Sequence, residues 1–173
     1  MNITISLNHS ADLTSLADRL AKYAAEFESK AQEVCMRLCE IGQDVLNSTY
    51  AAAAYAGTND ISVSIAPADE GATLTATGAV LGFIEFGTGI KYPLGEYAGQ
   101  VSAPAHGTYG KGKAQHGVWV YVGDAGNIGE VIATTPRGNV VRTDGNPPAN
   151  AFPRAVEAMR ENFEQVVQEV FRF

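Results

Sequence analysis

The sequence predicts an α+β domain in which a mostly antiparallel sheet is packed by a long N-terminal helix and a C-terminal helix. Apolar residues recur at steps of three and four over residues 10–50 and again over 150–171, which is the period of a helix with one buried face. Between them, apolar and polar residues alternate over 59–86, as in half-buried strands. All 173 residues are predicted to form a single domain, since this length can bury a core without disulfides or metals.

The composition is that of a globular protein, with 46% hydrophobic and 18% charged residues. A formal net charge of −7 argues against broad binding to a phosphate backbone, which needs a basic face. The two cysteines, Cys35 and Cys39, fall within one predicted helix, so we expect no disulfide framework, as suits a reducing cytoplasm. The N-terminus has neither a basic segment nor a long apolar run, so we expect no signal peptide and no membrane span.

The first elements are a short strand over 2–7 and the long helix over 10–50, for which Ser10 is a suitable N-cap. A straight helix of this length would be roughly 60 Å long, whereas a domain of this size is about 40 Å across. We therefore expect the helix either to break near Gly42 or to project from its domain. A projecting helix with an apolar stripe needs a partner to cover it.

Residues 59–86 predict a β-meander with strands at 61–65, 72–77 and 79–86, joined by short connections. Glu85 is unusual because it lies in the apolar third strand, where alternation places it opposite its two neighbours. Three interpretations stay open for it. It faces solvent or an edge and discourages wrong strand pairing, it forms an ion pair with another subunit through a residue such as Lys91 or Arg154, or it caps a helix or anchors a loop.

Residues 92–146 predict a long, β-rich loop insertion before the last helix. This segment holds eleven of the eighteen glycines, one clear strand near 118–122 and two further candidates near 131–134 and 140–141. Compact domains rarely carry connections of this length unless they are functional or become ordered by a partner. Tyrosine and tryptophan often anchor interfaces. The candidate interface residues are therefore Tyr92, Tyr97, Tyr109, Trp119 and Tyr121.

The last helix, over 150–171, has Asn150 as a plausible N-cap, and Pro153 is tolerated in its first turn. Its apolar stripe has the same period as that of the first helix. The two helices are expected to pack together or to lie side by side on the sheet.

The sequence predicts no catalytic, cofactor-binding or metal site. Residues 107–113 fit G-x-x-x-x-G-K, but Ala114 stands where a phosphate loop needs a hydroxyl for magnesium, which favours a flexible loop with two lysines. The two cysteines lack further ligands at a spacing that suits zinc. No triad motif includes a histidine. The three histidines are His9, His106 and His116.

Two short motifs carry a family resemblance. The first is the segment Phe83-Ile84-Glu85-Phe86-Gly87-Thr88-Gly89, and the second is Pro147-Pro148-Ala149-Asn150-Ala151-Phe152-Pro153. The pair resembles the tail-component family of tailed bacteriophages, the gene-product-ten-like proteins of the head–tail junction. Their pattern is an aromatic-Ile-Glu-Phe-Gly-Thr strand and turn, followed by a Pro-Phe-x-x-Ala helix start. This chain departs from the family pattern at residues 92–146, a segment that is longer and richer in aromatic residues than the minimal pattern. The motif positions are Phe83, Glu85, Phe86, Gly87, Thr88, Gly89, Pro148, Phe152 and Pro153.

The resemblance implies a structural virion protein of the phage neck, acting in tail completion or head–tail joining, and no enzyme. The implied partners are further copies of the chain in a ring and the adjacent head-connector and tail proteins, with genome DNA passing through the bore without sequence-specific binding. The chain would be made and assembled in the host bacterial cytoplasm and end in the virion, with no cofactor and no membrane. A tail-terminator or tail-tube-associated protein of the same virion is the alternative. A small hydrolase using the loop histidines is the alternative from another class.

Overall fold

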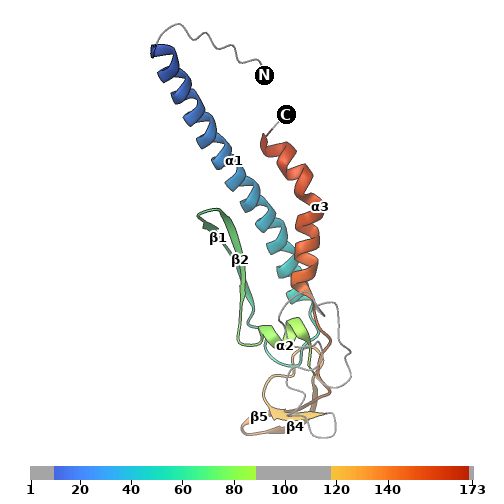
Figure 1. Ribbon diagram of the computed structural model, residues 1–173. Coiled ribbons are helices and arrows are strands. Elements are labelled where there is room, and N and C mark those ends of the chain that lie inside the picture. Colours follow the sequence, from blue (N-terminus) through green and yellow to red (C-terminus); the bar gives the residue numbers. More distant parts are fainter. Residues whose placement is uncertain (1–9, 89–117, 172–173) are drawn as a thin grey trace.

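The computed structural model describes residues 10–88 and 118–171, with side chains described from residue 13. Two long helices, α1 (Ser10–Ala51) and α3 (Ala151–Phe171), lie side by side over part of their length (Figure 1). Together with antiparallel strands they form an α+β fold, so the fold class predicted from the sequence is confirmed. The strand predicted at 2–7 lies outside the described residues.

A β-hairpin flanks α1. Its strands are β1 (Ser62–Ala68) and β2 (Gly71–Thr77), which pair antiparallel with Ser62 opposite Thr77. The apolar side chains Val63, Leu74 and Ala76 pack against the buried core. The opposite face is rich in serine and threonine and is exposed.

The length of α1 led us to expect either a break near Gly42 or a projecting end. The helix continues without a break through Gly42. A side chain at Gly42 would come within 2.8 Å of Leu74 Cδ2 and 3.1 Å of Met159 Sδ. The glycine therefore allows β2 and α3 to approach the helix closely from two sides. The N-terminal end of α1 extends past the end of α3 (Figure 1).

The predicted third strand at 79–86 is wrong. These residues form a short helix, α2 (Leu81–Phe86). Asp60 stabilises its beginning, since its carboxylate accepts hydrogen bonds from the N–H of Ala79 at 2.9 Å and of Val80 at 3.2 Å. These two hydrogen bonds hold the pKa of Asp60 below its usual value, and the bond from Ala79 has the larger effect. A short apolar run does not distinguish helix from strand by period alone, which explains the error.

The second part of the predicted insertion is a folded sheet. Strands β3 (Trp119–Val122), β4 (Glu130–Thr135) and β5 (Gly138–Thr143) pair antiparallel in the order β3-β5-β4. This sheet lies at the end of the molecule away from the N-terminal end of α1 (Figure 1). The strands expected near 118–122, 131–134 and 140–141 are therefore confirmed. The earlier part of the insertion, 89–117, lies outside the described residues.

The core has two clusters along the helices. One cluster joins α1, α2 and the start of α3, and its buried members are Leu46, Tyr50, Ile84, Ala151 and Ala155. The other joins α1 to the end of α3 through Val34, Val166 and Val170. Both clusters lie in the C-terminal half of α1.

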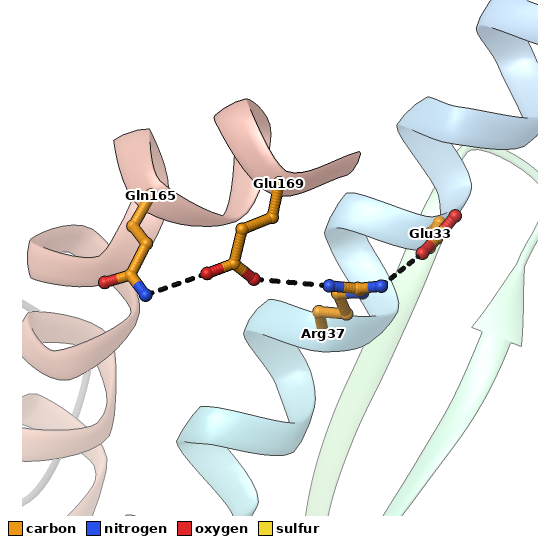
Figure 2. A network of polar contacts seen from close by, with 4 residues as sticks. All are labelled: Glu33, Arg37, Gln165 and Glu169. Carbon is orange, nitrogen blue, oxygen red and sulfur yellow. Dashed lines mark hydrogen bonds and ion pairs between the residues drawn. The ribbon is translucent and has the colours of Figure 1, made fainter. Parts of the chain in front are cut away.

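A polar network on the surface links α1 to α3 (Figure 2). The Arg37 guanidinium donates to Glu33 at 2.7 Å on its own helix and to Glu169 at 3.4 Å on α3. Gln165 donates to the other Glu169 oxygen at 2.8 Å. Exposed ion pairs of this kind contribute little stability, so the packing of the two helices depends mainly on the buried cluster of Val34, Val166 and Val170.

Candidate functional site

The two motifs meet at the N-terminus of α3, and Glu85 joins them. Its side chain is 2% exposed. One carboxylate oxygen accepts hydrogen bonds from Tyr50 Oη at 2.9 Å and from the Ala151 N–H at 3.0 Å, and the other accepts from the Phe152 N–H at 3.1 Å. A carboxylate at this place pairs the free N–H groups of the first turn and complements the helix dipole.

This geometry bears on two of the three interpretations of Glu85. The prediction that alternation places it on the outer face of a strand is wrong, because the residue lies in α2 and points to α3. It caps a helix, which was the third of the interpretations left open. Asn150, the predicted N-cap, precedes α3, but its Oδ1 is buried and accepts no hydrogen bond from the described residues. Glu85 supplies the cap from a distant part of the chain instead.

The turn after α2 is tied to the segment before α3. Thr88 and Asn146 exchange backbone hydrogen bonds, with the Thr88 N–H donating at 2.9 Å and the Asn146 N–H at 3.2 Å. The Asn146 side-chain amide also donates to the Phe83 carbonyl at 2.9 Å. Gly87 has φ 71° and ψ 168°, a backbone conformation that is nearly exclusive to glycine. The two motifs thus form one packed junction.

The remaining motif residues lie around the same junction, within the limits of the described chain. Pro148 is half-buried, and its backbone nitrogen lies against Gly87. Phe152 packs on the core cluster, and Pro153 is half-buried in the first turn of α3. Phe86 is half-buried at the end of α2. Gly89 lies outside the described residues.

Tyr50 is the partner that the sequence reasoning missed. It is 3% exposed and lies 35 residues before Glu85. Burial, the negative charge of Glu85 and the hydrogen bond between them raise the pKa of the Tyr50 hydroxyl far above its usual value. The hydroxyl therefore stays protonated and serves as a donor to the cap.

We expect folding stability to fall as the pH rises above the ordinary tyrosine pKa of 10.0, because the unfolded Tyr50 then loses its proton while the folded one keeps it. Tyr50→Phe should make the fall of stability with pH less steep, by up to about 1.4 kcal/mol per pH unit. At neutral pH it should lower the free energy of unfolding by about 1–2 kcal/mol. Urea unfolding of both proteins between pH 7 and 11 measures this. Parallel curves would show that Tyr50 does not carry the alkaline sensitivity.

A half-open cleft of about 390 Å³ lies between the junction and the three-stranded sheet. Its aromatic lining comes from Tyr55, Phe83, Trp119 and Tyr121. Trp119 and Tyr121 are half-buried on this domain, and the Tyr121 hydroxyl donates to the Asp124 carbonyl at 2.7 Å. Two of the five candidate interface residues therefore contribute to packing within the chain, while Tyr92, Tyr97 and Tyr109 lie outside the described residues.

The outer face of the same sheet carries exposed valines on β3 beside an ion pair, since Arg142 lies opposite Val120 and contacts Glu130 at 3.5 Å. Val120 and Val122 are more than half exposed on β3, on the face opposite Trp119 and Tyr121. Ile132 on β4 is also exposed. This face is a second region where apolar side chains remain in contact with solvent.

A row of exposed large apolar side chains runs along the N-terminal part of α1. These side chains continue the apolar stripe of α1 toward its N-terminus. Further along α1, at residues such as Val34 and Leu38, helix α3 covers this stripe. The side chains of the exposed row are Leu13, Leu20, Tyr23 and Phe27, exposed by 54, 56, 57 and 53%. Helix α3 reaches this stripe at its end, where the Phe171 ring lies 5.4 Å from that of Phe27. We call residues 13–27 the exposed stripe.

Cys35 and Cys39 are free thiols, and burial together with the nearby Cys35 raises the pKa of Cys39. Within the described residues, no three histidine, cysteine or acidic side chains lie close enough to hold a metal. In the same residues, no helix is long and apolar enough to cross a membrane. The three histidines and the 107–114 segment lie outside the described chain.

Comparisons with protein-family models, with curated proteins and with solved structures found no significant match to this chain.

Proposed function

We propose that this chain is a structural protein of the tailed-phage neck, which assembles as a ring and acts in tail completion or head–tail joining. The observation that supports an assembly role is the exposed stripe. Monomeric proteins seldom leave contiguous large apolar side chains in water, and such patches mark interaction sites. The phage assignment rests on the resemblance of the two motifs, which in this fold meet at one junction.

A ring needs two different surfaces on each subunit, because neighbours related by rotation make heterologous contacts. The chain offers two separate apolar surfaces at opposite ends. One is the exposed stripe of α1, and the other is the smaller exposed pair Val120 and Val122 on β3. This arrangement favours an assembly in which each subunit contacts more than one neighbour.

The proposal includes no reaction. Glu85, the buried carboxylate of the described chain, has its oxygens engaged by Tyr50 and by two N–H groups of α3. These contacts hold the elements together and leave the group in a helix-capping role. The net charge of −7 suits a subunit that lets DNA pass without gripping it.

Electron microscopy of purified particles, with this chain carrying a fused marker, tests the phage assignment. We expect the marker at the head–tail junction. A marker at the distal end of the tube or along it would favour the tail-terminator or tail-tube alternative. A marker absent from particles would overturn a virion role.

A double variant in which both Leu20 and Phe27 are changed to serine is expected to self-associate at least about 10-fold more weakly. The reason is that roughly 2 kcal/mol of binding free energy is lost for each large apolar side chain removed from a contact. Light scattering across a concentration series measures this. The matched control replaces Asp18 and Ala25, which lie on the opposite side of the helix, and should behave as the unmodified protein. A wild-type protein that stays monomeric at high concentration would contradict the prediction.

A further inference from the structure

The exposed stripe has the spacing of a short coiled-coil seam. Leu13, Leu20 and Phe27 are seven residues apart, and Leu16 and Tyr23 fall three residues after the first two. This is the a and d pattern of a heptad repeat over two heptads. The described elements leave four of these five side chains more than half exposed, and Leu16 partly exposed.

The residues on either side of the seam differ in chemistry. One flank carries Arg19 and Glu26, which have opposite charges and are seven residues apart. The other flank carries Ala17 and Ala24, also seven apart, which are small enough to let a second helix come close. All four flank residues are exposed, and α3 touches the seam at Phe27, where the Phe171 ring lies 5.4 Å away.

These flanks distinguish the possible directions of a second helix. In an antiparallel pair, equivalent flanks face each other, so Arg19 lies opposite the partner's Glu26 and Glu26 opposite the partner's Arg19. Ala17 then lies opposite the partner's Ala24. In a parallel pair, each charged residue would face an alanine. Complementary charge therefore favours the antiparallel arrangement, because each contact contains two opposite-charge pairs.

We propose that two copies of this chain form a dimer by pairing residues 13–27 of α1 antiparallel. In the register set by the charged flank, Leu20 of one copy packs against the partner's Tyr23, and Leu16 packs against the partner's Phe27. The two-fold axis passes beside residues 21 and 22. Each of these layers combines a leucine with an aromatic side chain, while Leu13 at the end of the seam lies opposite the partner's Lys30.

This dimer goes beyond the proposed ring and does not depend on it. An isologous contact closes on itself, whereas a ring grows through heterologous contacts. The exposed stripe cannot make both contacts at once, so the dimer belongs to the unassembled chain and covers the stripe until other contacts replace it. Two heptads form an interface at the small end of specific contacts, below about 1,200 Å², so association is reversible.

Charge reversal tests the pairing. Arg19→Glu and Glu26→Arg each place like charges opposite one another twice, and each should weaken the dimer about 10-fold in sedimentation equilibrium. The combined R19E/E26R protein restores both pairs and should return to within about 3-fold of the unmodified protein. Glu28→Arg, outside the seam, is the control and should leave the dimer unchanged. Single variants equal to the unmodified chain, or a combined variant weaker than either, would overturn the proposal.

Spin labels test the direction independently. In a chain with Cys35 and Cys39 replaced by alanine, labels at Ala21 lie near the axis and should be close together across the dimer. Labels at Ser29 should be offset by about 22 Å along the helices. A parallel pair would bring both labels equally close, and a pairing through any other surface would give neither distance. Either of those results, or a monomer at every concentration, would show that the antiparallel pairing is wrong.

Discussion

Replacing Glu85 with alanine is expected to lower the free energy of unfolding by about 4 kcal/mol. The substitution removes three hydrogen bonds from a buried carboxylate, and the Tyr50 hydroxyl and two N–H groups of α3 lose their acceptor. Each stranded buried donor retains its desolvation penalty, which exceeds the value of an ordinary hydrogen bond. Chemical denaturation followed by circular dichroism measures the change.

Two further variants separate the causes. Glu85→Gln keeps one acceptor oxygen and a similar volume. It should therefore lower the free energy of unfolding by roughly half as much as Glu85→Ala does. Glu164→Ala removes an exposed carboxylate from α3 and should stay within about 0.5 kcal/mol of the unmodified protein. If Glu85→Ala changed the free energy of unfolding no more than Glu164→Ala does, the buried carboxylate would not stabilise α3 in solution.

Gly87→Ala is the second substitution with a large expected effect, a loss of about 3 kcal/mol or more. Its φ of 71° with ψ of 168° strains any side chain, and the added carbon would lie 2.7 Å from the Pro148 nitrogen and 2.9 Å from the Asn146 oxygen. Both neighbours are backbone atoms, which cannot swing aside. The turn that joins the two motifs should therefore open.

Gly123→Ala is the matched control for this substitution. An added carbon at Gly123 would meet the ring of Tyr121 at 3.4 Å, an ordinary contact, and the residue does not have a positive φ. We expect a change within about 1 kcal/mol. Thermal unfolding compares the two proteins, and an equal melting temperature for both would contradict the role given to Gly87.

The sequence predicted the elements that have a long periodic pattern. Helix α1 was expected over 10–50 and spans Ser10–Ala51, and α3 was expected over 150–171 and spans Ala151–Phe171. Many turns of consistent apolar spacing specify a helix with one packed face. The hairpin and the three-stranded sheet were also predictable from alternation between turn residues.

The error at 79–86 has a physical cause. Six residues of α2 are too few for the helical period to appear, and their apolar side chains suit either structure. Asp60 favours the turn that leads into α2, because it accepts hydrogen bonds from the N–H groups of Ala79 and Val80 about twenty residues away. Tertiary contacts of this kind do not appear in a local pattern.

The same limit applies to the junction. Glu85 and the Phe-Gly-Thr turn were recognised as a motif, but Tyr50 and Asn146 were not connected to it. Their contacts span 35 and 58 residues of the chain. A tyrosine near the end of the long helix is the one signal that could have indicated a polar partner, because a phenol needs one when it is buried.

Hydrogen exchange of the α1 amides at low and high protein concentration tests the central claim that the exposed stripe is an assembly surface. Residues 34–50 lie in the core clusters and should be protected at every concentration. Residues 13–27 should exchange fast in dilute protein and become protected as the concentration rises. Protection of 13–27 that does not change with concentration, in a protein that scatters light as a monomer throughout, would contradict the account.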